Sequence, residues 1–520
     1  METESLSTIS QHCYLFPFRI MPLDIKDKSI VRLKMVFDML IKDGWVYEPY
    51  SPYDGVKNYN EFNYFHEYLR TALFEKRTQQ ELFYDKGDEK EPNFVSCLLS
   101  RPFTSGSFTL KIMERQEPYR LQLSGISLRL FETGIAILGF EVLNHTYSEF
   151  EDVSRINDFG RRVYPQFLAQ GNDGLPDINA VKDSFLPESV KLEIDGSEYA
   201  EYFTLNDFFV PGNDHQHIAR YIIDILGKNA TGAFKIEPVI DDRMFTLCWY
   251  ASNDFLKQQT EPKRRQYPFE SSAEWYRFIF LDGTSCCCTD VRTLKALIDA
   301  STYRRWVPET LFGITRCSLM CLCNSNAPSF IQVHMSRQYR FMMEILLAQR
   351  ASIIIFSSRI SDLSHDIDRK VDFNRIASNV RKLHSDFIGF VSRLWFEEVT
   401  PQDQGIEMFS LAMKNMGLKD QIRELKEEMN VLNEYVEMQY SRLRADQDRE
   451  QAKADREMNK GIYKLTLLAG FGVPLTILLS FWGMNFCFVD HKSGLHFLWT
   501  LGLAILIGIS LWRWAKRKED

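Results

Sequence analysis

The sequence predicts an α+β domain, then a long helical stalk, and then two C-terminal membrane-spanning helices. Three features support this order: strand-like runs in the first 335 residues, a long helical pattern after them, and two uncharged apolar stretches near the end. The predicted parts are an α+β domain at 1–335, a helical hairpin at 336–404, a stalk helix at 405–463, a first span at 464–486, a loop at 487–494, a second span at 495–514 and a basic tail at 515–520.

The first 335 residues contain short apolar runs with the alternation typical of strands. Ser127–Phe131 and Gly134–Val142 flank Glu132-Thr133-Gly134, which predicts a hairpin turn. Further strands are predicted at Phe108–Met113, Met244–Tyr250 and Tyr276–Leu281, and a loop at Pro165–Ser189. A region of this size can bury a core of its own.

Two long helical patterns follow the α+β region. Residues 338–398 predict a hairpin of helices with a break near Ser357–Ser361. From 405 to 463, apolar residues recur at steps of three and four, which predicts one stalk helix. Its lower part mixes acidic and basic side chains, so a regulatory cation site between subunits and a solvated helix with internal ion pairs both remain open. The acidic residues concerned are Asp446, Asp448, Asp455 and Glu457.

Two C-terminal stretches are long and apolar enough to cross a bilayer. Neither Leu465–Val489 nor Ser493–Trp512 contains Asp, Glu, Lys or Arg, and a helix of about 20 residues spans roughly 30 Å of hydrocarbon. Basic residues precede the first stretch and follow the second, so the positive-inside rule places the N-terminal side of the first stretch and the C-terminal side of the second in the cytoplasm. The polar start of the chain does not resemble a signal peptide. We therefore expect a multi-pass protein of the inner membrane with a cytoplasmic N-terminal domain.

A short motif lies at the outer end of the first predicted span. Pro474-Leu475-Thr476 is followed by Gly483-Met484-Asn485, and in this topology the pair resembles the signature of CorA-type magnesium channels. The resemblance implies a funnel-shaped homopentamer in the lipid bilayer, with Gly483, Met484 and Asn485 as the selectivity filter. The amide oxygen of Asn485 would accept hydrogen bonds from the water shell of a hydrated cation, which suits Mg²⁺ because this ion sheds water reluctantly.

The first span also predicts the pore wall. The residues that precede Asn485 at helical spacing form a stripe without charge. Such a stripe suits a narrow pore that closes when water leaves its cytoplasmic end. The alternative is that half of these side chains pack against neighbouring helices. The predicted pore-lining residues are Ile462, Leu465, Ala469, Val473, Thr476 and Ser480.

Two features depart from the family pattern. The outer loop Phe486–Lys492 has one carboxylate, so its attraction for divalent cations is weaker than in typical members. The cytoplasmic part is far longer, which is similar to CorA-like proteins associated with type III CRISPR systems. In that group the implied ligand is a nucleotide second messenger, such as a conjugate of S-adenosylmethionine and AMP. Three basic pairs would meet phosphates or lie solvated on the surface: Arg161-Arg162, Arg264-Arg265 and Arg304-Arg305.

The sequence therefore predicts a CorA-like channel for divalent cations that its cytoplasmic domain gates. Mg²⁺ is expected as the permeant ion and also as a regulatory ion. Two alternatives stay open: an antiviral effector channel opened by a nucleotide, and a membrane-tethered binding protein that does not conduct. The chain has no P-loop, no GxGxxG and no nucleophile elbow, so an enzyme is not predicted, and no organic cofactor is identified.

Other patterns in the chain are weak. The net charge of −8 argues against direct nucleic-acid binding. Asp214-His215-Gln216-His217 lacks a clear third metal ligand and is interpreted as ordinary surface. The cysteines lack paired CxxC spacing, and we interpret them as free thiols rather than as a zinc site. They are Cys286, Cys287, Cys288, Cys317, Cys321 and Cys323.

Overall fold

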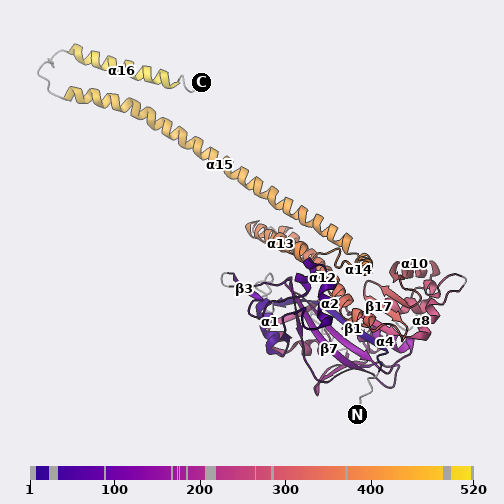
Figure 1. Cartoon of the computed structure of the whole chain (residues 1–520). Helices are drawn as coiled ribbons and strands as arrows, with labels where there is room; N and C mark the ends of the chain where they lie inside the picture. Colours follow the sequence, from indigo (N-terminus) through magenta and orange to yellow (C-terminus); the bar gives the residue numbers. More distant parts are fainter. Residues whose placement is uncertain are drawn as a thin grey trace. The chain divides into compact units, whose positions relative to one another are not determined.

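The computed structural model describes most of the chain, in two compact units (Figure 1). The units are Met1–Val431 and Leu432–Asp520. The described residues are 7–22, 33–86, 89–165, 168–172, 174, 176–182, 186–204, 218–263, 265–282, 286–368, 373–483 and 494–516. Within them, an α+β region precedes a long helix, as the sequence predicts.

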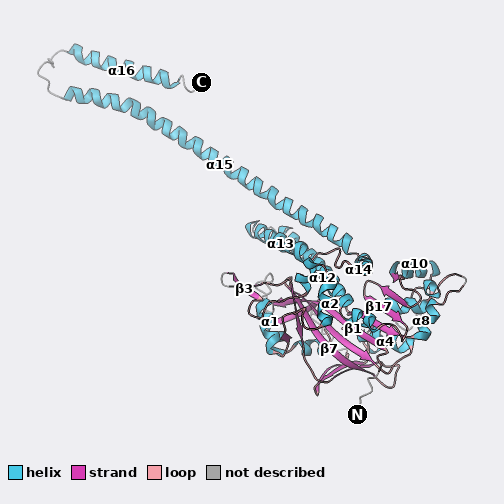
Figure 2. Ribbon diagram, viewed as in Figure 1, coloured by secondary structure: helices cyan, strands magenta, loops and turns pink. Residues whose placement is uncertain are grey.

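A 13-stranded sheet forms the frame of the first unit (Figure 2). Its main path is β12-β11-β6-β7-β8-β1-β14-β17-β16-β15, with β13 paired to β1, and β5 paired to β2 and β7. The pairing is antiparallel except between β14 and β17. The strands are β1 (Ser10–Pro22), β2 (Val46–Tyr47), β5 (Ser96–Ser100), β6 (Gly106–Lys111), β7 (Tyr119–Phe131), β8 (Ile135–Asn144), β11 (Ser189–Ile194), β12 (Ser197–Glu201), β13 (Phe234–Pro238), β14 (Phe245–Ala251), β15 (Thr302–Tyr303), β16 (Thr310–Ile314) and β17 (Ser318–Cys323).

The β7–β8 hairpin confirms the strands that were predicted on either side of Glu132-Thr133-Gly134. Gly134 has φ +80°, a left-handed conformation that glycine adopts without steric cost. Its amide donates to the carbonyl of Phe131 at 3.0 Å and closes the turn. The predicted strands at Phe108–Met113 and Met244–Tyr250 also correspond to strands, β6 and β14.

The strand predicted at Tyr276–Leu281 is wrong, because this segment lies in helix α9 (Ala273–Phe280). The Ser272 side chain caps the helix by accepting a hydrogen bond from the Trp275 amide at 3.1 Å. Trp275, Phe278 and Ile279 are buried at helical spacing in an apolar core that they share with β14 and β17.

Short elements complete the first unit. The segment predicted as a loop, Pro165–Ser189, is largely irregular where it is described, with a short β9–β10 pair inside it. The helices are α1 (Leu33–Lys42), α2 (Val56–Tyr64), α3 (Glu67–Leu73), α4 (Phe150–Gly160), η2 (Asn179–Val181), α6 (Arg220–Leu226), α7 (Lys228–Ala233), α8 (Asn253–Thr260), η3 (Pro268–Ser271), α10 (Val291–Ser301) and α11 (Ser329–Ser336). The small strands are β3 (Phe83–Lys86), β4 (Glu89–Pro92), β9 (Ala169–Gln170) and β10 (Pro176–Asp177).

Helix α12 (Gln338–Asp368) crosses the sheet and contacts β1 and β8. The helical stretch Ser329–Ile367, which covers α11 and all but the last residue of α12, is the one helix among the described residues with the length and composition to cross a membrane. Because 83% of its apolar window is buried inside the unit, α12 is a core helix. The break predicted at Ser357–Ser361 is wrong, since these residues lie inside α12, and α13 (Phe373–Arg393) packs against it.

The predicted start of the stalk is also wrong. Helix α14 (Asp403–Met416) ends at Gly417, which has φ +70° and donates its amide to the carbonyl of Lys414 at 3.0 Å. Helix α15 (Leu418–Gly483) starts directly after it and runs without interruption from the predicted stalk into the first predicted span. Helix α16 (Gly494–Lys516) covers the second apolar stretch.

Candidate functional site

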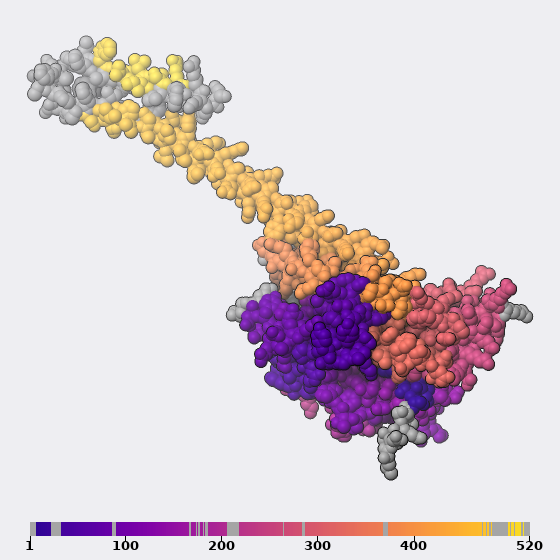
Figure 3. All heavy atoms as spheres, viewed as in Figure 1, coloured from indigo at the N-terminus to yellow at the C-terminus, as the bar shows by residue number. Residues whose placement is uncertain are grey.

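The predicted pore-lining side chains all lie on the C-terminal part of α15 and all are exposed in the single chain. Ile462 is 52% exposed, Leu465 68% and Val473 55%. Steps of three and four residues place such side chains along one face of a helix. They are Ile462, Leu465, Ala469, Val473, Thr476 and Ser480, and Figure 3 draws the described atoms of this part of α15 in light orange.

Apolar side chains are exposed on other faces of the same helices as well. Leu468 and Ile477 of α15 are 70% and 63% exposed, and Leu498, Trp499 and Leu506 of α16 are 65%, 71% and 64% exposed. A water-facing helix keeps one polar face, whereas a helix that is apolar all round is covered by protein or lipid. The end of α15 and α16 therefore require a cover that the single chain does not supply.

Thr476 and Pro474 shape the polar surface of this helix. Pro474 has no amide hydrogen, so it cannot donate to the carbonyl of Gly470 as other helical residues do. The Thr476 hydroxyl donates to the carbonyls of Gly472 and Val473 at 2.8 and 2.9 Å. Because its hydrogen is used within the helix, the exposed Thr476 hydroxyl can act toward other groups only as an acceptor. An acceptor oxygen is the group that a cation or its water shell requires.

The predicted filter lies mostly outside the described residues. Gly483 is the last residue of α15, while Met484 and Asn485 fall outside the described ranges, as does the outer loop that follows them. The role of Asn485 toward a hydrated cation therefore stays a prediction from the sequence.

The other patterns that were weighed as metal ligands lie in different parts of the chain, and a regulatory cation site between subunits stays a prediction. The stalk carboxylates Asp446, Asp448, Asp455 and Glu457 are exposed, and Asp446 pairs with Arg449 at 3.4 Å along the same helix. Asp214-His215-Gln216-His217 lies outside the described residues. Cys321 and Cys323 are buried in β17, whereas Cys286, Cys287, Cys288 and Cys317 are at least partly exposed. No group of three or more His, Cys, Asp or Glu side chains comes together in the part of the chain that the structure describes.

A buried ion-pair network fixes α12 to the sheet, and sequence reasoning missed it. Glu344 of α12 accepts from Arg129 Nε of β7 at 2.6 Å and from Arg340 Nε at 2.9 Å. Arg129 also donates to the carbonyl of Leu73 at 2.9 Å, and Arg340 pairs with Glu141 of β8. Burial alone would raise the pKa of Glu344, but the two guanidinium groups together hold this pKa below its ordinary value.

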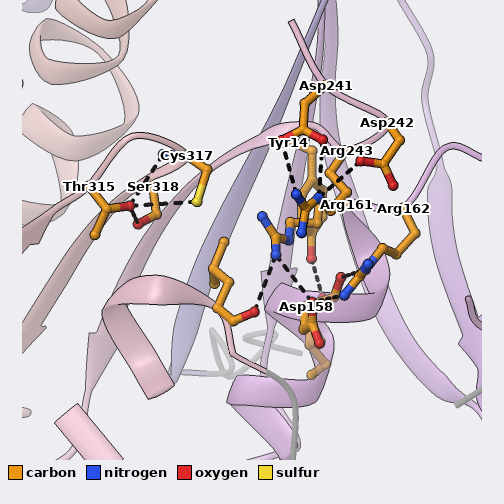
Figure 4. A network of polar contacts seen from close by, with 12 residues as sticks. Tyr14, Asp158, Arg161, Arg162, Asp241, Asp242, Arg243, Thr315, Cys317 and Ser318 are labelled. Carbon is orange, nitrogen blue, oxygen red and sulfur yellow. Dashed lines mark hydrogen bonds and ion pairs between the residues drawn. The ribbon is translucent and has the colours of Figure 1, made fainter. Parts of the chain in front are cut away.

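The basic pairs that sequence reasoning singled out have different surroundings. Arg161 and Arg162 follow α4 and are only 1% and 6% exposed, so the solvated alternative is wrong for them. Asp158 Oδ1 accepts from Arg161 Nη2 at 3.3 Å and from Arg162 Nη2 at 2.7 Å (Figure 4).

The remaining pairs lie elsewhere. Arg304 and Arg305 are exposed, and each already has acidic partners: Arg304 pairs with Glu270 and Asp299, and Arg305 with Glu407. Arg264 is outside the described residues, and Arg265 is exposed.

Long-range strand pairing places further charged residues beside Arg161 and Arg162. Arg162 forms an isolated antiparallel β-bridge with Arg243, and the Met244 amide donates to the carbonyl of Arg161 at 2.8 Å. The Arg243 side chain pairs with Asp241 and Asp242, each at 3.2 Å (Figure 4). The sequence separates Arg162 and Arg243 so widely that no local pattern would have joined them.

The comparison with protein families locates the recognisable part of the chain. Residues 341–517 match the family model described as CorA-like Mg2+ transporter protein. The match begins in α12 and extends through α16, so the whole 13-stranded sheet precedes it. No curated protein matches the chain. Residues 341–517 therefore form a CorA-like region of the chain, similar to the family of CorA-like Mg2+ transporter proteins.

Proposed function

We propose that this protein is an oligomeric channel that conducts divalent cations across the inner membrane, with Mg²⁺ as the permeant ion. One observation carries the proposal: the CorA-like match contains the uninterrupted helix α15, whose end exposes an apolar and hydroxyl-bearing surface in the single chain. Assembly in a bilayer accounts for that exposure, because neighbouring copies and lipid would cover it.

The pore requires several copies of the chain. Two helices per chain cannot enclose a pore, and the family resemblance supports a pentamer. In that arrangement the α15 stripe from Ile462 to Ser480 lines the pore, and Asn485 contacts the hydrated ion at the outer mouth. Leu465 and Ile462 form the apolar constriction at the cytoplasmic end, where removal of water stops conduction.

The N-terminal unit is proposed as the regulator. Residues 1–340 lie outside the family match, yet their sheet holds α12, on which the match begins. The Arg129–Glu344–Arg340 network supports this role, because a change in the sheet reaches α12 through buried ion pairs. The same network favours a second candidate function, a channel that opens only when a ligand binds the N-terminal unit.

The test is ion flux into liposomes that contain the full-length protein and an internal Mg²⁺-sensitive dye. We expect flux with the wild type and its loss with Asn485→Ala. The matched control is Asn459→Ala, the same substitution at an exposed position of α15 before the predicted span, which should conduct normally.

Other outcomes separate the alternatives. Flux that appears only with a nucleotide second messenger supports the ligand-opened channel. No flux under either condition, from protein that is correctly inserted and oligomeric, refutes conduction and leaves a membrane-tethered binding protein. Equal flux in Asn485→Ala and Asn459→Ala refutes the filter.

A further inference from the structure

A second site is indicated inside the N-terminal unit, where several arginines meet. The "arginine cluster" consists of Arg161 and Arg162 after α4, Arg243 before β14, Arg350 on α12, and Arg316 in the β16–β17 turn. Arg350 Nη1 donates to the carbonyl of Arg316 at 3.4 Å. The β-bridge joins Arg162 to Arg243, and Asp241 interacts electrostatically with Arg161, Arg243 and Arg350.

The cluster holds more positive than negative charge. Its carboxylates Asp158, Asp241 and Asp242 pair with Arg161, Arg162 and Arg243, which leaves Arg350 as a buried arginine without an ion pair among the described residues. Burial and a hydrogen bond to Asp241 raise the pKa of Asp242 to about 7, so part of its negative charge is lost near neutral pH. Buried charges in proteins are normally paired, and a net excess of this kind is costly unless something else neutralises it.

Two of the buried arginines also have unused donors. Arg161 is 1% exposed, and its Nε and Nη1 find no hydrogen-bond acceptor within the described ranges. Arg350 is 5% exposed, and its Nε likewise has no acceptor there. Burial, and then the charge of Arg316, lower the pKa of Arg350 to about 10. Buried donors without acceptors lose their interactions with water and gain nothing in return.

We propose that the arginine cluster is a binding site for a phosphate-bearing anion. A phosphate group brings about two negative charges and three acceptor oxygens, which matches both the charge excess and the unused N–H groups of Arg161 and Arg350. The planar guanidinium fork suits two oxygens of one phosphate at a time. Arg243 is 29% exposed at its side chain and Arg316 is exposed, so two members of the cluster reach solvent.

The competing explanation is that Arg161 has only a structural role. Its remaining Nη2 donates to Asp158 at 3.3 Å and to the carbonyl of Leu281 at 3.2 Å, both long contacts. Asp158 keeps its shorter bond from Arg162 at 2.7 Å when Arg161 is replaced. Removing Arg161 from an unoccupied site therefore costs little stability and relieves repulsion among the arginines. A purely structural role of Arg161 predicts instead that its replacement clearly lowers the stability of the protein.

The site includes a residue of α12, the helix on which the CorA-like match begins. Arg350 lies on α12, inside the CorA-like region, while Arg161, Arg162 and Arg243 belong to the sheet side of the unit. A phosphate that bridges Arg161 and Arg350 would fix α12 against the sheet. This consequence for gating rests on the proposed channel function, whereas binding of the anion does not.

The experiment is calorimetric titration of the full-length protein in detergent at low salt. The probes are inorganic phosphate, pyrophosphate and AMP, with adenosine as the uncharged control. We expect saturable binding of one or more of the phosphate probes, no binding of adenosine, and an affinity at least about tenfold weaker in Arg161→Met and in Arg350→Met. Arg304→Met, an exposed arginine with acidic partners of its own, is the matched control and should bind as the wild type does.

Thermal unfolding without ligand completes the test. The melting temperature of Arg161→Met should stay within about 3 °C of the wild type, and if this variant does not fold, Arg350→Met carries the comparison. The proposal is overturned if the wild type binds no phosphate probe at millimolar concentration, or if both variants bind as tightly as the wild type. Binding without any effect on flux would leave the site intact and refute only its link to gating.

Discussion

Replacement of Glu344 by leucine tests whether buried charge holds α12 to the sheet. Glu344 is 1% exposed and accepts one charge-assisted hydrogen bond from Arg129 and one from Arg340. Glu344→Leu keeps most of the side-chain volume but leaves two buried guanidinium groups with one carboxylate, Glu141, between them.

The size of the effect follows from these contacts. Two hydrogen bonds to charged groups contribute about 1.5–3 kcal/mol each, and loss of one partner of a buried ion pair costs about 3–5 kcal/mol. Arg129 keeps the Leu73 carbonyl and Arg340 keeps Glu141, so we expect a loss of about 3 kcal/mol in the free energy of unfolding, at the lower end of that range.

The assay is urea denaturation of the full-length protein in detergent, followed by near-ultraviolet circular dichroism. The matched control is Glu397→Leu, which removes an exposed carboxylate paired with Lys419 at 2.9 Å and should cost at most about 1 kcal/mol. Arg129→Met combined with Glu344→Leu should recover part of the loss, because it also removes one of the two uncompensated charges. A loss below about 1 kcal/mol in Glu344→Leu would refute the reasoning.

Three further outcomes are expected. Burial raises the pKa of Glu132 to about 7, against the opposing charge of Arg393, so the folded state holds a proton that the unfolded state releases above about 4.5. The free energy of unfolding therefore falls as pH rises between these values, and Glu132→Gln should remove up to about 3 kcal/mol of that fall, as measured by urea denaturation at pH 5 and pH 8. Gly417→Ala should destabilise by about 1 kcal/mol because of its φ of +70°, whereas Gly232→Ala, in a helix with open space around it, should not; equal effects in thermal unfolding would contradict this. Iodoacetamide should modify the exposed Cys287 in the folded protein, whereas mass spectrometry should find the buried thiols unmodified until denaturant is added. Modification of a buried thiol before denaturant is added would contradict the described burial; the buried thiols are Cys13, Cys97, Cys248, Cys321 and Cys323.

The sequence was most informative where the decisive interactions are local. The β7–β8 hairpin could be predicted because alternating apolar runs flank a turn with glycine at its left-handed position. The stalk could be predicted as helix because apolar residues recur at steps of three and four in its first part, and the first predicted span because it is a long uncharged apolar stretch. Gly417 could have marked the true start of this helix, since glycine commonly ends one helix before the next.

Elements that depend on tertiary packing were harder to predict. The aromatic run at Tyr276–Leu281 resembles a strand, and the capping serine at 272 was the available signal for a helix. In the same way, α12 carries the short apolar run Ile353–Phe356 as part of a helix that the sheet buries, which no local pattern indicates.

The candidate sites differ in how far sequence could identify them. The predicted pore stripe follows from spacing along one helix, and its role as a pore lining stays a prediction. The arginine cluster could not, because Arg162 meets Arg243 through long-range strand pairing, and Arg350 arrives on a separate helix. The sequence indicated one basic pair of that cluster and none of its acidic partners.

The continuity of α15 gives it the mechanical property of a lever. Its 66 residues correspond to a length of about 100 Å at about 1.5 Å per residue. A tilt of about 3° at one end of a rod of that length displaces the other end by about 5 Å. Gly417, which separates α15 from α14, is placed as a fulcrum. A displacement of less than one ångström near Gly417 would thus become a displacement of about 5 Å at the far end of the helix.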